Sequence, residues 1–62
     1  MKRQHTEEFI LKIAAELNKT PYEVKSQVNE YLGKNLLYYQ AINYLRDLNA
    51  DDIRFILRFN TF

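Results

Sequence analysis

Few side chains in this sequence have the type and spacing needed for acid–base or metal chemistry. His5 is the single histidine and cysteine is absent. Because His5 lies in a short polar stretch, we expect it to face solvent rather than serve as a ligand or general base. Asp51 and Asp52 are adjacent, and adjacent positions on a helix point in different directions, so helix capping is favoured over a metal site or an acid–base pair. A single glycine also excludes a glycine-rich phosphate loop. The sequence predicts a non-enzyme without metal, cofactor or small-molecule substrate.

Aromatic side chains are the more informative feature, since five Tyr and four Phe occur in 62 residues. Between residues 35 and 48 apolar side chains point in nearly every direction around the expected helix, which must then be covered on several sides. Tyr and Phe are enriched where proteins meet, because they bury a large area with few rotatable bonds. The predicted protein-binding residues are Tyr39, Tyr44, Phe55, Phe59, Phe62, Arg54 and Arg58. Arg46 and Asp47 join the two arginines in the expected charged rim.

The apolar excess predicts a partner, which is either a second copy of this chain or a different protein. A module of this kind could be an adaptor, a phage-type inhibitor of a host factor or a chaperone-like element. Abundant Lys, Asn, Ile, Tyr and Phe fit AT-rich coding, as in a low-GC bacterium or its phage.

Nucleic acid is the alternative partner. Ala14, Asn18, Thr20, Val24 and Val28 have the spacing of helix-turn-helix proteins, and this resemblance implies a DNA-binding regulator. The residues offered to DNA would be Lys19, Tyr22, Lys25, Ser26, Gln27 and Asn29, with further phosphate contacts from Lys2, Arg3 and Lys34. A net charge of +1 is a weak footprint for such binding, and Glu23 and Glu30 lie near the DNA-facing side.

These side chains must be positioned by local elements, and capping signals indicate an all-α bundle of four short helices near 6–18, 20–32, 35–48 and 50–60. Thr6 can cap the first helix, and Thr20-Pro21-Tyr22-Glu23 forms a capping box with Pro at the first helical position. Gly33 supplies a left-handed stop, and Asn49 caps the last helix. Residues 53–62 are also compatible with a strand, because β-branched and aromatic residues dominate them.

Helical spacing then predicts which residues face inward. They are Phe9, Ile10, Ile13, Ala14, Leu17, Val24, Val28, Tyr31, Leu32, Leu37, Ala41, Leu45, Leu48, Ile53, Ile56 and Leu57. Lys25, Gln27 and Glu30 are expected to face outward.

The domain organisation is predicted to be simple, with a flexible polar arm at residues 1–5 and one helical domain at 6–62. No apolar run approaches the roughly 20 residues that cross a bilayer, and no signal-peptide core follows the charged start. We therefore expect a cytoplasmic protein with no membrane partner.

A second resemblance covers roughly Glu8 to Ala50. The runs Ile13-Ala14-Ala15-Glu16-Leu17-Asn18, Thr20-Pro21-Tyr22-Glu23-Val24, Leu36-Leu37 and Ala41-Ile42-Asn43-Tyr44-Leu45 resemble the helical C-terminal chaperone segment of trigger factor. The resemblance implies a helical surface that cradles apolar segments of other proteins, with Tyr22, Leu36, Tyr39 and Tyr44 as contacts. The Phe-rich end of the chain has no counterpart in that family.

Overall fold

A computed structural model describes residues 5–59, and this part of the chain contains helices and no strand. The helices are α1 (Glu7–Glu16), α2 (Pro21–Leu32), α3 (Tyr38–Arg46) and α4 (Ala50–Leu57). The predicted all-α fold of four short helices is confirmed, and residues 53–57 are helical. Residues 1–4 of the predicted arm at 1–5 lie outside the described residues, and α4 ends at Leu57 rather than near residue 60.

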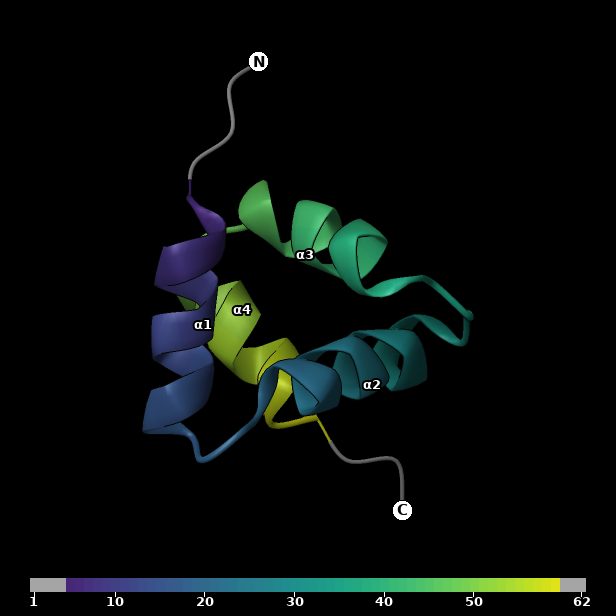
Figure 1. Cartoon of the computed structure of the whole chain (residues 1–62), viewed down its shortest axis with the longest axis horizontal. Helices are drawn as coiled ribbons and strands as arrows, with labels where there is room; N and C mark the ends of the chain where they lie inside the picture. Colours follow the sequence, from purple (N-terminus) through teal and green to yellow (C-terminus); the bar gives the residue numbers. More distant parts are fainter. Residues whose placement is uncertain (1–4, 60–62) are drawn as a thin grey trace.

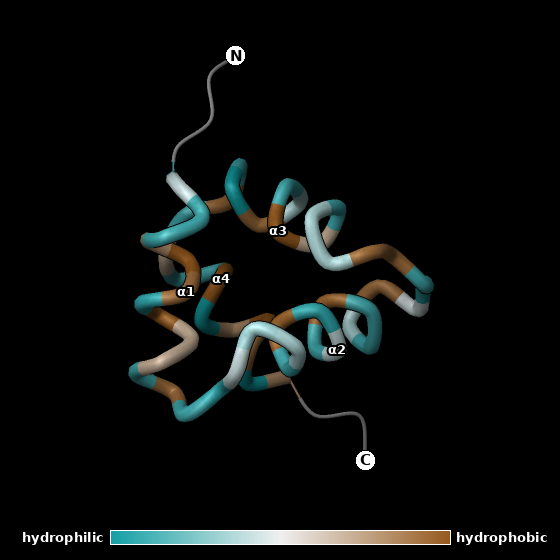
Figure 2. Tube along the Cα trace, viewed as in Figure 1, coloured by the Kyte–Doolittle hydropathy of each residue, from teal (hydrophilic) through white to brown (hydrophobic). Residues whose placement is uncertain are grey.

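The four helices pack as a small bundle in which α1 and α2 each contact the other three (Figure 1). In this view α1 stands at one side, α2 and α3 extend away from it, and α4 passes behind α1 and α2. Hydrophobic residues of the helices turn toward the middle of the bundle (Figure 2). Helix α4 packs mainly against α1 and α2.

The junction between α1 and α2 is built from local signals. Asn18 adopts a left-handed φ of 62°, which Asn tolerates better than most residues. The N–H of Lys19 then donates to the carbonyl of Ala14 at 2.8 Å, closing the end of α1. Thr20 and Glu23 form the predicted capping box, with bonds of 3.2 and 2.8 Å. The prediction for the start of α2 is confirmed.

The junction between α2 and α3 differs from the prediction. Gly33 has the expected left-handed φ of 66°. The Asn29 side chain then bonds the backbone of Leu36 twice, accepting from its N–H at 2.7 Å and donating to its carbonyl at 3.1 Å. Because this clamp uses both backbone groups of Leu36, α3 begins at Tyr38 and not near residue 35. Leu37 consequently lies in the cap position, 53% exposed, so its predicted place in the inward row is wrong.

The core is formed by eleven buried apolar residues drawn from all four helices. They are Ile10, Ile13, Ala14, Val24, Val28, Ala41, Ile42, Leu45, Ile53, Ile56 and Leu57. On α3 the buried residues are Ala41, Ile42 and Leu45, so Ile42 joins the core although it was not in the predicted inward row. No polar residue of the described chain is fully buried, so the core carries no unpaired charge.

His5 is packed against the domain, although the sequence places it at the end of a mobile arm. Its N–H donates to the carbonyl of Arg46 at 3.3 Å, and its carbonyl accepts from Nε of Arg46 at 2.9 Å. Its ring stacks on Phe9 with centroids 4.4 Å apart. These contacts join the start of α1 to the end of α3, so the expectation that His5 faces solvent is wrong.

Candidate functional site

Three aromatic rings meet where the end of α2 lies against α4, and we call Tyr31, Phe55 and Phe59 the aromatic cluster. The Tyr31 ring meets both phenylalanines edge-on, with centroids 6.1 Å from Phe55 and 5.2 Å from Phe59. Phe55 and Phe59 are 6.1 Å apart. Such geometry is favourable for aromatic pairs. Phe55 is nevertheless 58% exposed, so the rings form a surface and not a second core.

The aromatic cluster is held from behind by a side chain of α2. Phe55 and Phe59 are four residues apart and therefore share one side of the chain at α4. The amide of Gln27 donates to the carbonyl of Ile56 at 3.3 Å and to that of Phe59 at 2.8 Å. The Ile56 carbonyl lies in the last turn of α4 and the Phe59 carbonyl just beyond it, where helical backbone partners run out. Gln27 therefore faces α4, and its predicted outward orientation is wrong.

Two grooves flank Phe55. The first, about 530 Å³, is lined by Asp51, Arg54, Phe55, Arg58 and Phe59. The second, about 250 Å³, is lined by Tyr31, Tyr44, Leu48, Asp52, Phe55 and Ile56. Because Phe55 belongs to both linings, its ring forms the ridge between them.

Charged side chains border the first groove and lie on one stripe of α4. We call Asp51, Arg54, Phe55 and Arg58 the outward stripe, because their spacing of three and four residues places them on one helix face. Asp51 and Arg54 form an ion pair at 3.6 Å in which the carboxylate side chain is 97% exposed. An exposed pair of this kind adds little stability. Arg58 is exposed and forms no ion pair with another residue of the described chain.

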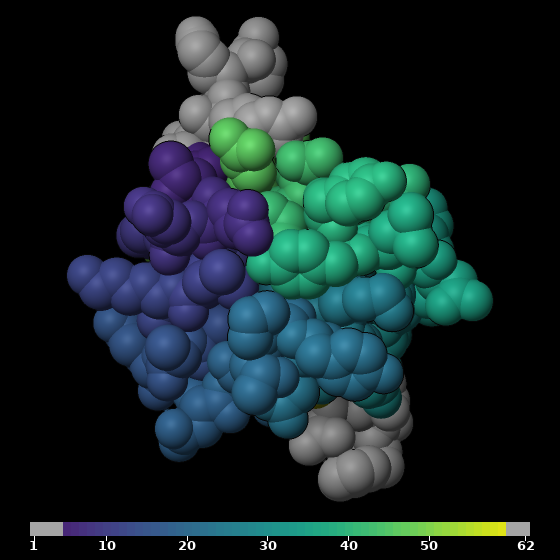
Figure 3. All heavy atoms as spheres, viewed as in Figure 1, coloured from purple at the N-terminus to yellow at the C-terminus, as the bar shows by residue number. Residues whose placement is uncertain are grey.

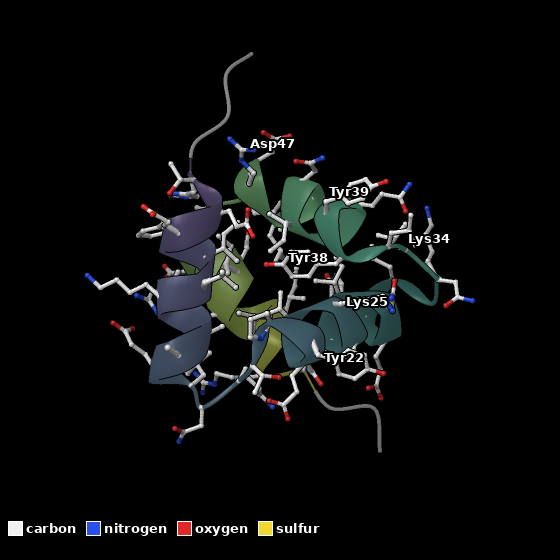
Figure 4. The ribbon with its side chains drawn as sticks, in the orientation of Figure 1. Tyr22, Lys25, Lys34, Tyr38, Tyr39 and Asp47 are labelled. Carbon is white, nitrogen blue, oxygen red and sulfur yellow. The ribbon has the colours of Figure 1, made fainter. Side chains whose placement is uncertain are left out.

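The structure brings five of the predicted protein-binding residues together: Tyr44, Arg54, Phe55, Arg58 and Phe59 line the two grooves. Tyr39 is 63% exposed but lines neither groove (Figure 4). Phe62 lies outside the described residues.

The other members of the expected rim are elsewhere. Arg46 bonds the backbone of His5, so its guanidinium helps hold the residues that precede α1 in the described chain. Asp47 lies beside it at the end of α3 (Figure 4). Neither residue borders the aromatic cluster.

Two residues of the aromatic cluster and the outward stripe were not predicted as binding residues. Tyr31 was expected inside but is 38% exposed, and Asp51 was expected only as a capping acid. No local signal in the sequence identifies Tyr31, because its place with Gln27 on the side of α2 that faces α4 follows only from the packing of the two helices.

The predicted nucleic-acid residues are only partly available for a ligand. Tyr22 is 71% exposed, and Nζ of Lys25 lies 5.8 Å from its ring centroid. Gln27 and Asn29, however, are engaged in the bonds to α4 and to Leu36 described above. Tyr22 and Lys25 lie on the face formed by α1, α2 and α3, with α4 behind (Figures 3 and 4). Lys19 and Ser26 are half-buried.

Three observations bear on acid–base or metal chemistry. Among residues 5–59 no three His, Cys, Asp or Glu side chains come together as metal ligands would. Nε2 of His5 is buried and has no hydrogen-bond partner within the same residues. Burial raises the pKa of Tyr38 to about 12, helped by the hydrogen bond that its hydroxyl donates to Glu7 at 2.8 Å. That phenol joins α3 to α1 and faces no groove described above.

Comparison with family models, curated proteins and solved structures finds no match for this chain. The resemblances to trigger factor and to helix-turn-helix proteins therefore remain predictions. Among the described helices, none combines the length and apolarity required to cross a bilayer.

Proposed function

We propose that this chain is a small, non-enzymatic helical interaction module that binds another protein through the aromatic cluster. The observation that carries the proposal is the exposure of Phe55 at the ridge between two grooves. Its ring is fixed by neighbouring rings on two elements, so little side-chain freedom is lost when a partner covers it. A pre-positioned aromatic side chain with charges around it is the arrangement expected of an interface anchor.

The surrounding charges support the same proposal. Arg54 and Arg58 border the first groove. Arginine is favoured in protein interfaces because it combines a flat guanidinium with a long apolar stem. The two arginines and Asp51 would set the register of a partner, while Phe55 and Phe59 supply the buried area. Adaptor, phage-type inhibitor of a host factor and chaperone-like element are roles that such a cytoplasmic module would suit.

The helix-turn-helix alternative ranks second. Its exposed Tyr22, with the half-buried Lys25 beside the ring, favours contact with a base or a phosphate. Gln27 and Asn29 would have to leave bonds that hold α4 and the α2–α3 junction. A gel-shift assay tests it, since binding of duplex DNA at low salt should fall steeply as salt is raised.

Site-specific photo-cross-linking tests the leading proposal. The photoreactive residue p-benzoylphenylalanine replaces Phe55 in one variant and Tyr22 in a matched control, since both native rings are more than half exposed. The purified variants are irradiated alone and in extract of the native host. We expect protein adducts from position 55 and few from position 22. Equal yields from the two positions, or no adduct from position 55, would contradict the proposal.

A further inference from the structure

We infer that the partner of the outward stripe is a second copy of this chain, packed with its α4 antiparallel to the first around a two-fold axis. The inference rests on the proposed function, because it names the occupant of the same surface. The inference depends on the order of charges along α4. When two copies of this helix run in opposite directions, the acid of each copy lies opposite an arginine of the other.

The geometry of the stripe sets the register. Asp51 and Arg58 are seven residues apart, which is about two turns or about 10 Å along a helix. Arg54 and Phe55 lie midway between them, and all four side chains line the first groove. A two-fold axis that passes α4 level with Arg54 and Phe55 therefore places Asp51 of one copy opposite Arg58 of the other.

The charges select the antiparallel arrangement. Each copy has Asp51 at the start of the stripe and Arg58 at its end, and Arg58 forms no ion pair with any of residues 5–59. Antiparallel packing forms the Asp51–Arg58 contact twice, as a two-fold interface requires. Parallel packing would instead place Asp51 against Asp51 and Arg58 against Arg58, which is repulsive. The opposed helix dipoles favour the same arrangement.

In the same antiparallel register, the residues at the centre of the outward stripe also match those of the second copy. Arg54 of one copy faces Phe55 of the other, so each guanidinium can lie over an aromatic ring. The Phe55 ring of each copy then enters the 530 Å³ groove of its neighbour, whose wall includes Phe59. Arg54 is already partly ordered by Asp51 at 3.6 Å, which positions its guanidinium along the stripe.

Charge reversal with rescue tests this pairing in the full chain. Asp51→Arg and Arg58→Asp are made singly and together, and Glu8→Arg is the matched control, since Glu8 is also an exposed acid in the first turn of a helix. Sedimentation equilibrium over a range of concentrations gives the dimer dissociation constant, and circular dichroism checks folding. Asp51→Asn and Arg58→Gln replace the reversals if either reversal unfolds the chain.

We expect a wild-type dimer, and each reversal should raise its dissociation constant about tenfold or more because both symmetry-related contacts become repulsive. The double reversal should return to within about threefold of wild type, since the exchanged charges pair again. The neutral variants should each weaken the dimer by about threefold. Glu8→Arg should leave it unchanged.

Three results would overturn the inference: a monomer at every concentration, reversals no more disruptive than Glu8→Arg, or no recovery in the double variant. A monomer whose position 55 cross-links to a different protein would refute self-pairing while leaving the proposed function intact. Absence of any adduct from position 55 would refute the proposed function itself.

Discussion

The two faces of α4 have different compositions and different surroundings. Its inward face carries Ile53, Ile56 and Leu57, each at most 2% exposed and packed in the core. Its outward face carries charges on both sides of Phe55, which is 58% exposed. A helix of eight residues thus completes the core with one face and presents an aromatic surface with the other. The apolar residue on the outward face is therefore not required to close the core.

Substitution on the inward face should have the largest effect on folding. Leu57 is fully buried, so Leu57→Ala should lower the free energy of unfolding by about 2–5 kcal/mol through lost burial and a cavity. Urea denaturation followed by circular dichroism measures the change. A loss below about 1 kcal/mol would mean that α4 contributes less to the core than its burial indicates.

Removal of the Gln27 amide should have a smaller effect and act on both faces. Gln27→Ala leaves the carbonyls of Ile56 and Phe59 without this donor, which should lower the free energy of unfolding by about 1–2 kcal/mol. Because Phe59 is then less firmly held, cross-linking from position 55 should also weaken. Asn43→Ala, at an exposed amide of α3, is the control and should change neither measurement.

Substitution on the outward face should separate binding from folding. Phe55→Ala should change the free energy of unfolding by about 1 kcal/mol or less, since it loses only part-exposed contacts with Tyr31 and Phe59. Chemical denaturation measures the free energy of unfolding. Binding of the Phe55→Ala variant to a partner protein should be strongly reduced. If Phe55→Ala destabilised the chain as much as Leu57→Ala, the distinction between the two faces would fail.

The smallest expected effect is that of Tyr38. Ionisation of its phenol changes the stability of the fold and does not involve the outward stripe. Its pKa is raised to about 12 in the folded chain, so the fold favours the neutral phenol. In the unfolded chain the phenol ionises near its ordinary value of about 10. Stability from this group is therefore fully present below about pH 10 and is lost as the pH rises toward 12.

Urea denaturation between neutral and alkaline pH checks this sign. Tyr38→Phe should show a shallower decline in stability above pH 10 than the wild type, with little difference in slope below it. If stability declined equally above pH 10 in the wild type and in Tyr38→Phe, ionisation of the Tyr38 phenol would not be the cause of the decline.

The sequence predicts those features whose signal and partner lie within one or two turns. Thr20 and Glu23 are three residues apart, and their capping box follows from that spacing alone. Gly33 is likewise identified by its residue type, because a left-handed φ favours glycine. The helix count and most of the core follow from such local rules.

Features that depend on distant partners could not be predicted in this way. Gln27 bonds Phe59 across 32 positions, and Arg46 bonds His5 across 41. An Asn or Gln on a helix is compatible with solvent exposure until the packing places a carbonyl beside it. The sequence predicted the part of the candidate site that comes from one stretch of chain, namely Arg54, Phe55, Arg58 and Phe59. Tyr31 joined it only through the contact between α2 and α4.

Hydroxyl-radical footprinting tests most directly whether the outward face of α4 is covered by protein. Oxidation of Phe55 and Tyr22 is compared in dilute purified protein and inside cells that naturally make the chain. Both rings are more than half exposed in the isolated molecule, so both should react when it is dilute. We predict that Phe55 becomes protected in the cell while Tyr22 does not. Equal protection of the two rings, or continued oxidation of Phe55, would contradict the assignment of this face as the binding surface.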